Sequence, residues 1–372
     1  MKIAFINNST GWGGLEMNTL KLAKLLSEKE YQISLISNKN STIYKKGEHV
    51  FSETLLLKNI KRLFDINSAK AISLFLKEKN INTIFVFDNK DIDVVAWIKI
   101  LFDKDLTIIY QQHMQIGINK RDIFHTLRFK TIKYWISPLQ YLKDEIALRT
   151  YFPVDRVKVI PLCMDISKFT YKKYTKQQAL QLLNITPKAP LIGIIGRFSK
   201  KKGQLFLVEC LLKLKQKGIN IEILIVGSAT INDPEGIEYY EQICKYVKDN
   251  NLEDVVHIKE SNADVALFYN AVDIFVLASH SETYGMVTIE AMLSQLPIIA
   301  TKSGGTSEIL QDGKLGSLFE YENHDEFCNK LIWILNNKTE VETIALKAKR
   351  IAIEKYDQQI EIDAIDDLLK EI

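Results

Sequence analysis

Two basic residues flank a short turn that could hold an anion. Arg197 follows the apolar run LIGIIG, and Lys202 ends the lysine cluster before Gly203. An arginine guanidinium can bind two phosphate oxygens at once, whereas a lysine supplies a compact positive charge. A helical pattern begins after Gly203, and helix N-termini attract anions. The order of strand, basic turn and helix therefore predicts a phosphate site.

Two glutamates farther along the chain could accept hydroxyl groups. Glu282 and Glu290 stand eight residues apart, and a helix is expected to begin near Met286. Glu282 would then lie in the loop before this helix, and Glu290 would project from it. Carboxylates accept hydrogen bonds from neighbouring sugar hydroxyls. The free amides at the start of the helix can donate to phosphate oxygens; they belong to Tyr284, Gly285, Met286 and Val287.

A glycine cluster near the N-terminus suggests a dinucleotide site, but its spacing argues against one. The stretch GWGGLE follows the apolar run KIAFI. A dinucleotide fingerprint requires a third glycine where this chain has Glu16. It also requires a carboxylate about 20 residues later, which is missing after ISLIS. The glycine cluster is therefore not expected to be a dinucleotide site, and Glu16 is a candidate acceptor or helix-capping residue.

These residues depend on a framework of alternating strands and helices. Apolar runs separated by helical patterns form two series. The first series is KIAFI, YQISLIS, INTIFVF and LTIIYQQ; the second is LIGIIGRF, IEILIVG, VVHIKE, DIFVLAS, LPIIAT and LGSLFE. Such alternation predicts parallel sheets crossed by helices. The expected fold class is α/β, with two Rossmann-like doubly wound domains facing across a deep cleft, where a ligand would meet the carboxyl ends of the strands.

Chain length and periodicity set the expected domain boundaries. A chain of 372 residues exceeds the size at which one core usually keeps growing. Helical periodicity lapses in the stretch VKVIPLCMDISKFTYKKYTKQQA. We expect domains at 1–170 and 171–350, with a helical tail at 351–372 that returns to the first domain.

Composition favours a cytoplasmic protein with a basic first half. No apolar run approaches the roughly 18 residues of a membrane span, and no signal peptide is expected. The four cysteines stand too far apart for zinc ligation or a disulfide framework. Residues 1–170 carry 26 Lys plus Arg against 17 Asp plus Glu, whereas the remainder carries 23 against 29. This excess fits either lysine-rich solvation or contact with an anionic partner, including the inner face of the cytoplasmic membrane.

Two further segments need an interpretation. Asp91 and Asp93 form a D-x-D pair, a spacing that can bind metal, but they begin an apolar helix, so capping is the preferred interpretation. Residues 125–135, HTLRFKTIKYW, are expected to form a basic amphipathic helix. Its apolar residues, Phe129, Ile132, Tyr134 and Trp135, fit core packing at least as well as a membrane surface.

The order of motifs resembles the retaining GT-B glycosyltransferases of family four. The motifs are GRFSKKKG, SETYGMVTIEAM with its two glutamates, LPIIATKSGGTSEI and DGKLGSLF, and GWGGLE resembles the family's first loop. The likeness extends over essentially the whole chain. It implies transfer of a sugar from a nucleotide diphosphate sugar, with retention at the anomeric carbon and no essential metal or other cofactor.

The resemblance also implies a role for each site residue. Arg197 and Lys202 would clamp the donor diphosphate, Glu290 would hold the ribose hydroxyls, and Glu282 would orient the donor sugar. His113, after LTIIYQQ, matches a histidine near the reacting sugar. Gly13 and Gly14 would let the backbone of the acceptor-binding N-terminal domain approach the donor held by the second domain. The catalytic set is thus His113, Glu282, Arg197 and Lys202.

The expected function is a hexosyltransferase or N-acetylhexosaminyltransferase. UDP-sugar is the favoured donor, and a glycan or lipid-linked acceptor of bacterial surface polysaccharide or lipopolysaccharide synthesis is the expected partner. No acidic residue of the first domain marks itself as a nucleophile, which favours substitution on one face of the sugar. A sugar-nucleotide epimerase or hydrolase and a non-catalytic nucleotide-sugar binding partner remain alternatives. Nucleic-acid binding is not expected, because no reading motif accompanies the basic residues.

Overall fold

The computed structural model divides the chain into two compact units. It describes residues 1–58, 60, 64–170, 173–228, 233–260 and 264–372. Unit 1 contains Met1–Cys163 and Gln358–Ile372, and unit 2 contains Met164–Asp357. The first division precedes the expected boundary at 170. The second follows the expected boundary at 350, because one helix of unit 2 continues to Tyr356.

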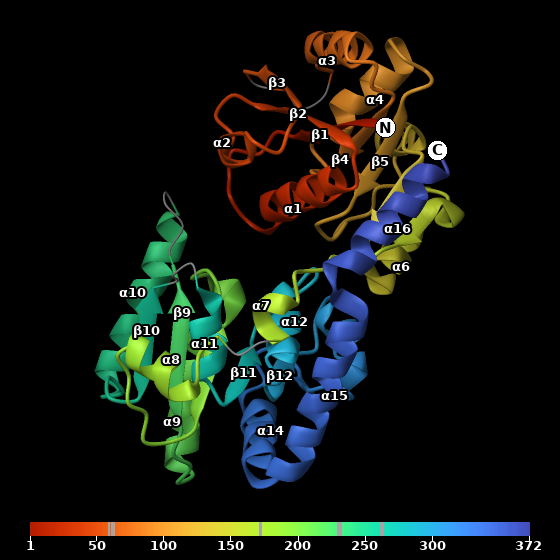
Figure 1. Cartoon of the computed structure of the whole chain (residues 1–372). Coiled ribbons are helices and arrows are strands. Elements are labelled where there is room, and N and C mark those ends of the chain that lie inside the picture. Colours follow the sequence, from red (N-terminus) through yellow and green to blue (C-terminus); the bar gives the residue numbers. More distant parts are fainter. Residues whose placement is uncertain (59, 61–63, 171–172, 229–232, 261–263) are drawn as a thin grey trace. The chain divides into compact units, whose positions relative to one another are not determined.

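Unit 1 is built on a seven-stranded sheet in the order β3-β2-β1-β4-β5-β6-β7 (Figure 1). Every strand pair is parallel. The strands are β1 (Lys2–Asn7), β2 (Gln32–Asn38), β3 (Glu53–Leu57), β4 (Thr83–Val86), β5 (Thr107–Gln111), β6 (Tyr134–Ser137) and β7 (Val157–Val159). The helices are α1 (Gly14–Glu28), α2 (Thr42–Gly47), α3 (Ile66–Glu78), α4 (Ile92–Leu101), α5 (Ile123–Lys130), α6 (Gln140–Arg149) and α16 (Gln358–Lys370), with a 3-10 turn at Val154–Arg156.

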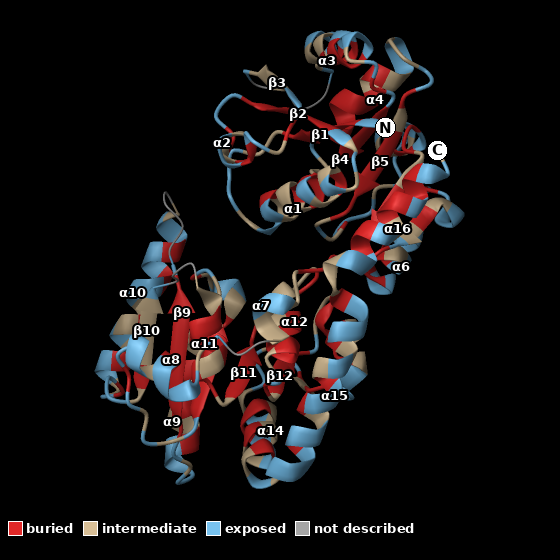
Figure 2. Ribbon diagram, viewed as in Figure 1, coloured by how far each residue is buried: buried red, intermediate tan, exposed pale blue. Residues whose placement is uncertain are grey.

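Alternate residues of the unit 1 strands enter two separate cores. In β1, Ala4 and Ile6 pack with residues of α3 and α4, whereas Ile3 and Phe5 pack with residues of α1 and α16. This two-residue alternation is expected of a strand covered by helices on both faces. Figure 2 shows the result, with buried central strands and helices that are exposed on their outer sides. The doubly wound architecture predicted for the first half is confirmed.

Unit 2 repeats the plan with a six-stranded parallel sheet in the order β10-β9-β8-β11-β12-β13. Its strands are β8 (Leu191–Ile195), β9 (Glu222–Gly227), β10 (Val256–Glu260), β11 (Ile274–Leu277), β12 (Ile298–Thr301) and β13 (Ser317–Phe319). Its α-helices are α7 (Ser167–Thr170), α8 (Lys176–Leu182), α9 (Gln204–Gln216), α10 (Pro234–Asp249), α11 (Val265–Ala271), α12 (Met286–Leu293), α13 (Thr306–Ile309), α14 (His324–Asn336) and α15 (Lys338–Tyr356). Two 3-10 turns lie at Lys200–Lys202 and Gln311–Gly313.

The returning tail predicted from the sequence is confirmed, and a buried carboxylate anchors it. The chain leaves unit 2 at Asp357, and α16 packs Ile362, Ile365 and neighbouring apolar residues into the core beside α1. Glu361 is fully buried, and its carboxylate lies 2.5 Å from the Lys21 ammonium and accepts a 2.9 Å bond from the Cys163 amide. The tail also brings five carboxylates, so unit 1 holds 26 Lys plus Arg against 21 Asp plus Glu. The charge excess of the first half is therefore partly neutralised within the unit.

The expected helix over 125–135 is wrong in its extent. Helix α5 ends at Lys130, and Tyr134 and Trp135 belong to strand β6. Phe129 and Trp135 are buried and pack ring against ring at 5.1 Å between centroids. The aromatic residues of this segment therefore fill the core. Within the described part of the chain, no helix is both long and apolar enough to cross a membrane.

Candidate active site

The reversal of strand order marks a ligand-binding edge in each unit. In unit 1 the order reverses between β1 and β4, and in unit 2 it reverses between β8 and β11. Helices leave a crevice at such a point, beside the carboxyl ends of the strands. Arg197 and Glu282 of unit 2 follow β8 and β11, and Gly13 and Gly14 of unit 1 follow β1, whereas His113 follows β5.

A glycine with no space for a side chain shapes the basic turn after β8. Gly203 has φ 72°, and a Cβ atom there would lie 2.3 Å from the carbonyl oxygen of Ala278. This close approach connects the turn with the loop after β11, and the amide of His280 donates to the carbonyl of Lys201 at 2.8 Å. The Gln204 side-chain amide donates to the carbonyl of Arg197 at 3.0 Å. The backbone is thus fixed while the Arg197 side chain is exposed.

Two predicted site residues form an ion pair. The Lys202 ammonium lies 2.7 Å from the Glu282 carboxylate. The side chains are 31% and 18% exposed, so the pair remains accessible from outside. The carbonyl of Glu282 also accepts a 2.9 Å bond from the amide of Gly305, which ties the loop after β11 to the loop after β12. The loops after three neighbouring strands therefore converge on one charged pair.

Glu290 has a tyrosine partner that the sequence reasoning missed. Glu290 projects from α12, and the hydroxyl of Tyr269 on α11 donates to its carboxylate at 2.6 Å. Burial raises the pKa of Glu290, and the hydrogen bond from Tyr269 opposes this shift. Tyr269 is 3% exposed, and its sequence context is an ordinary buried helix, so no local signal distinguishes it from a core tyrosine.

The predicted amides stand where α12 begins. Gly285 precedes the helix with φ 94°, a left-handed conformation that favours glycine. Tyr284 and Gly285 are buried, whereas Met286 and Val287 are partly exposed. Unit 2 thus places the clamp residues and the start of α12 on loops at the same edge of its sheet.

A small pocket beside this edge was not singled out from the sequence. It has a volume of about 350 Å³ and lies at the ends of β9 and β10. Its walls include the aromatic rings of Phe198 and Tyr240, together with Ser228 and Lys259. A flat aromatic ligand with polar edges would suit these walls.

His113 follows β5 at the carboxyl edge of the unit 1 sheet. Its ring centroid lies 6.0 Å from that of Phe87, and its Nε2 atom is buried with no hydrogen-bond partner among the described residues. Burial, and secondly the positive charge of Lys21, lower the pKa of His113 to about 3. The imidazole is therefore neutral at physiological pH.

The N-terminal glycine cluster leads directly into α1. The amide of Gly13 donates to the Glu16 carboxylate at 2.7 Å. Glu16 is 6% exposed, so the geometry makes it a helix-capping residue. A Cβ atom added at Gly14 would meet no atom of the described residues within 4 Å, so the described part of unit 1 does not require glycine at this position.

The D-x-D pair begins α4, as expected, but Asp91 does not cap the helix through its side chain. Instead, its carboxylate accepts a 3.1 Å bond from the amide of Asn8. Burial, reinforced by the charge of Asp88, raises the pKa of Asp91 to about 7. Asp93 pairs with Arg128 at 2.7 Å. The two carboxylates thus have separate partners.

Comparison with known proteins assigns the class. Residues 176–355 match the family described as "Glycosyl transferases group 1". The structure resembles that of Anabaena Alr3699/HepE in complex with UDP, with a TM-score of 0.86 and 20% identity over the full length of both chains. It also resembles a glycosyltransferase from Rickettsia africae, with a TM-score of 0.87, 20% identity, and coverage of 100% of this chain and 98% of that one.

The second half of the chain thus matches the group 1 glycosyltransferase family, and the two units have the GT-B type of fold. Among curated relatives, the lipopolysaccharide 1,2-N-acetylglucosaminetransferase of Salmonella typhimurium is 30% identical over 59% of this chain and 58% of its own length. The trehalose synthase of Pyrococcus horikoshii is 25% identical over 79% of this chain and 70% of its own length. These relatives bear names of different activities, so the likeness does not select a sugar or an acceptor.

Proposed function

We propose that the protein transfers a sugar, with retention of anomeric configuration, from a nucleotide diphosphate sugar to a glycan or lipid-linked acceptor. The observation that carries the proposal is the Lys202–Glu282 ion pair at the carboxyl edge of the unit 2 sheet. A donor diphosphate would compete for the Lys202 ammonium. The released Glu282 carboxylate could then accept hydroxyls of the donor sugar. One binding event would thus assemble both the anion clamp and the sugar contact.

In this proposal, unit 2 holds the donor from end to end. Arg197 and Lys202 neutralise the diphosphate as the nucleotide leaves. The amides at the start of α12 are additional donors to its oxygens. Glu290, positioned by Tyr269, accepts the ribose hydroxyls, and the pocket whose walls include Phe198 and Tyr240 receives the base.

We assign unit 1 to the acceptor. His113 would donate or accept a hydrogen bond there as a neutral group, because its pKa lies far below physiological pH. The open space at Gly14 would admit the donor. Substitution would occur on one face of the sugar, with the leaving phosphate taking the acceptor proton. The enzyme groups would position the substrates and stabilise charge, without a metal ion.

The donor and the pathway form the finer part of the proposal. UDP-glucose is the first donor to test, since structures of the Anabaena protein contain UDP or UDP-glucose. The Salmonella relative is named for lipopolysaccharide synthesis, and a Staphylococcus aureus relative that is 28% identical over 46% of this chain is named for capsular polysaccharide biosynthesis. We therefore propose a role in surface polysaccharide synthesis, at the inner face of the cytoplasmic membrane.

A thermal-shift panel of UDP, GDP, ADP and dTDP sugars tests the proposal first. A ligand at about 100 times its dissociation constant stabilises the folded state by roughly 2.7 kcal/mol. We expect a shift with UDP sugars, and absence of a shift with every donor would contradict the assignment. Transfer by the Glu282→Gln variant should then fall sharply; unchanged turnover would remove Glu282 from the site.

Product analysis separates transfer from the alternative activities. Epimerisation or hydrolysis would convert the donor equally well with and without acceptor, whereas transfer requires the acceptor. A non-catalytic binding partner would respond in the thermal-shift panel but yield no product with any acceptor. The coexistence of Arg197, Lys202, Glu282 and Glu290 favours transfer over mere binding.

A further inference from the structure

Helix α5 of unit 1 exposes apolar side chains where a surface helix usually carries polar ones. Ile123 is 67% exposed, Phe124 is 66% exposed and Leu127 is 53% exposed. Residues three and four positions apart along a helix share a face, and Leu127 stands three positions after Phe124 and four after Ile123. Single exposed apolar residues are ordinary on protein surfaces, but three on a helix of eight residues form a patch.

A large groove extends this patch toward α4. Phe124 and Leu127 line one side of the groove, and Trp97 and Ile100 of α4 line another. Phe64 completes the wall; it is 61% exposed and its ring lies 5.3 Å from that of Trp97. The groove has a volume of about 1020 Å³. We call these five residues together with Ile123 the apolar surface of unit 1.

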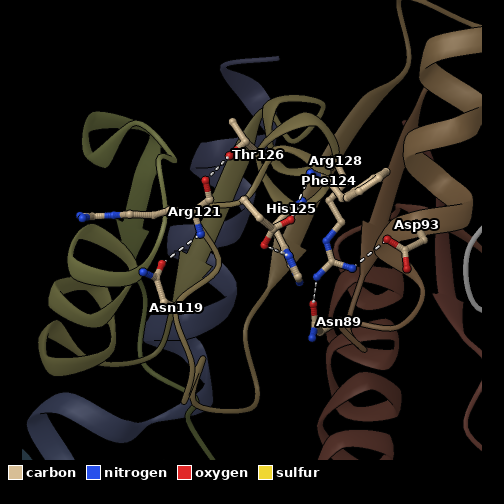
Figure 3. A network of polar contacts seen from close by, with 9 residues as sticks. Asn89, Asp93, Asn119, Arg121, Phe124, His125, Thr126 and Arg128 are labelled. Carbon is tan, nitrogen blue, oxygen red and sulfur yellow. Dashed lines mark hydrogen bonds and ion pairs between the residues drawn. The ribbon is translucent and has the colours of Figure 1, made fainter.

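The acidic groups beside the apolar surface have basic partners. Arg128 lies between Asp93 and Asn89 in Figure 3 and binds both, at 2.7 and 2.8 Å. The Asp122 carboxylate accepts hydrogen bonds from the first amides of α5 and pairs with His125. These interactions anchor α5 while its apolar face remains outward.

Positive charge surrounds the groove. Lys99 and Lys130 line it, and Lys130 is exposed. Burial lowers the pKa of Lys99, and the positive charges of Arg156 and Lys133 lower it further, so these three basic side chains interact with one another. Asp103 and Asp105 oppose the shift more weakly. Lys120 and Arg121 precede α5, and Arg121 is exposed. An apolar face with a basic border is suited to a bilayer that carries negative headgroups.

We propose that the apolar surface of unit 1 docks on a membrane leaflet that contains anionic phospholipid. Phe124, Leu127 and Ile123 enter the boundary between headgroups and acyl chains, and the surrounding lysines and arginines contact the phosphates. The inference concerns unit 1, and its test requires neither a sugar donor nor turnover. Its failure would therefore be distinguishable from failure of the proposed transferase activity.

Cosedimentation of the full chain with vesicles tests the docking. One set of vesicles contains phosphatidylcholine alone, and the other also contains phosphatidylglycerol. We expect binding to the anionic vesicles that weakens as salt is raised. The double variant Phe124→Ser and Leu127→Ser should reduce partitioning about ten-fold or more, because two apolar side chains no longer leave water. Lys130→Glu should weaken binding to anionic vesicles only.

A matched control separates docking through α5 from nonspecific binding of exposed apolar residues. Leu346 on α15 of unit 2 is 49% exposed, and Leu346→Ser should leave partitioning unchanged. The substituted residues of α5 are exposed, so the thermal unfolding midpoint should stay near that of the wild type. In a second readout, Phe124→Trp should shift its fluorescence to shorter wavelength on anionic vesicles.

Three results would overturn the proposal. The first is absence of wild-type binding to anionic vesicles, and the second is equal binding by the wild type and the double variant. The third is a concentration-dependent dimer that the double variant abolishes, without vesicle binding, which would show that a second copy of the chain covers the surface.

Discussion

At the scale of single residues, the hydrogen bond from Tyr269 to Glu290 predicts a pH effect. A carboxyl group whose pKa is raised in the folded chain binds its proton more readily, so it contributes stability at low pH that is lost as pH rises through its folded pKa. Hydroxyl binding needs the opposite form, the carboxylate. Nucleotide affinity should therefore fall as pH drops toward the raised pKa. Tyr269→Phe removes a bond that holds this pKa down, so the acid limit of UDP affinity should move to higher pH.

Titration calorimetry across pH measures this shift. Tyr246→Phe on α10 is a suitable control, since the charged groups that act on Tyr246 are Glu209 and Cys210 and not Glu290. A Tyr269→Phe variant whose affinity profile coincides with the wild type at every pH would show that Glu290 does not bind the ribose.

The lowered pKa of His113 predicts the opposite dependence of folding stability on pH. Its pKa is lowered from 6.5 to about 3, so the unfolded chain binds a proton at this residue before the folded chain does. The stability that its neutral form contributes is present above pH 6.5 and is lost as pH falls from 6.5 toward 3. His113→Gln should flatten the plot of stability against pH in this range, and it should lower sugar transfer near neutral pH. Denaturant unfolding at several pH values checks the first effect, and an unaltered slope would contradict it.

At the scale of elements, two glycines at the N-termini of helices should respond differently to the same substitution. Gly203→Ala forces a side chain into left-handed backbone and against the carbonyl of Ala278, and should destabilise unit 2 by roughly 1–3 kcal/mol. Gly14→Ala meets open space at the start of α1 and should change stability by at most a few tenths of a kcal/mol. Urea unfolding of both variants makes the comparison. Equal losses would mean that the close approach at Ala278 is not a constraint.

Gly14 also allows a test of its proposed place beside the donor. Gly14→Val should lower transfer far more than UDP affinity, because the proposed nucleotide site lies in unit 2, whereas the added side chain would approach the sugar that is transferred. A collapse of UDP affinity in a folded Gly14→Val protein would instead return the glycine cluster to the role of a nucleotide site.

The elements differed in how well their sequences predicted them. All six strands of unit 2 were expected, because each is an apolar run bounded by helical patterns. The sequence does not predict strands β3 and β7. Each is at a sheet edge and is only partly buried, and its apolar run is at most three residues long. Strand β6 was absorbed into a helix prediction, because Lys133, Tyr134 and Trp135 continue the apparent spacing of α5.

The candidate site was predictable in its residue types and less so in its pairings. Charged residues after apolar runs marked the loops, since parallel strands bring those loops to one edge. The contact between Lys202 and Glu282 spans 80 positions, and the Tyr269 bond to Glu290 depends on how α11 packs. Neither follows from local spacing. The sequence also does not indicate which apolar residues of α5 are exposed, because only tertiary packing shows that Phe129 is buried and Phe124 is exposed.

At the scale of the whole molecule, helix α16 near the C-terminus contributes to the stability of unit 1, which also contains the N-terminus. Glu361 is fully buried and binds Lys21, Cys163 and Gln111 of unit 1, the last at 3.3 Å. Glu361→Gln keeps the shape of the side chain but leaves the Lys21 ammonium without its carboxylate. Because Lys21 is still 20% exposed, water would offset part of the loss, and we expect destabilisation of about 1–3 kcal/mol.

A second carboxylate on the same helix supplies the comparison. Asp363 pairs with Lys29 at 2.6 Å, but its side chain is 51% exposed, so Asp363→Asn should have little effect. Scanning calorimetry of both variants should show the larger loss for Glu361→Gln, while the stabilisation produced by UDP stays the same, because the proposed nucleotide site lies in unit 2. Equal losses would mean that the tail is held by its apolar face alone, through Ile362, Ile365, Leu368 and Leu369. A reduced response to UDP would instead show that anchoring this helix affects the donor site in the other unit.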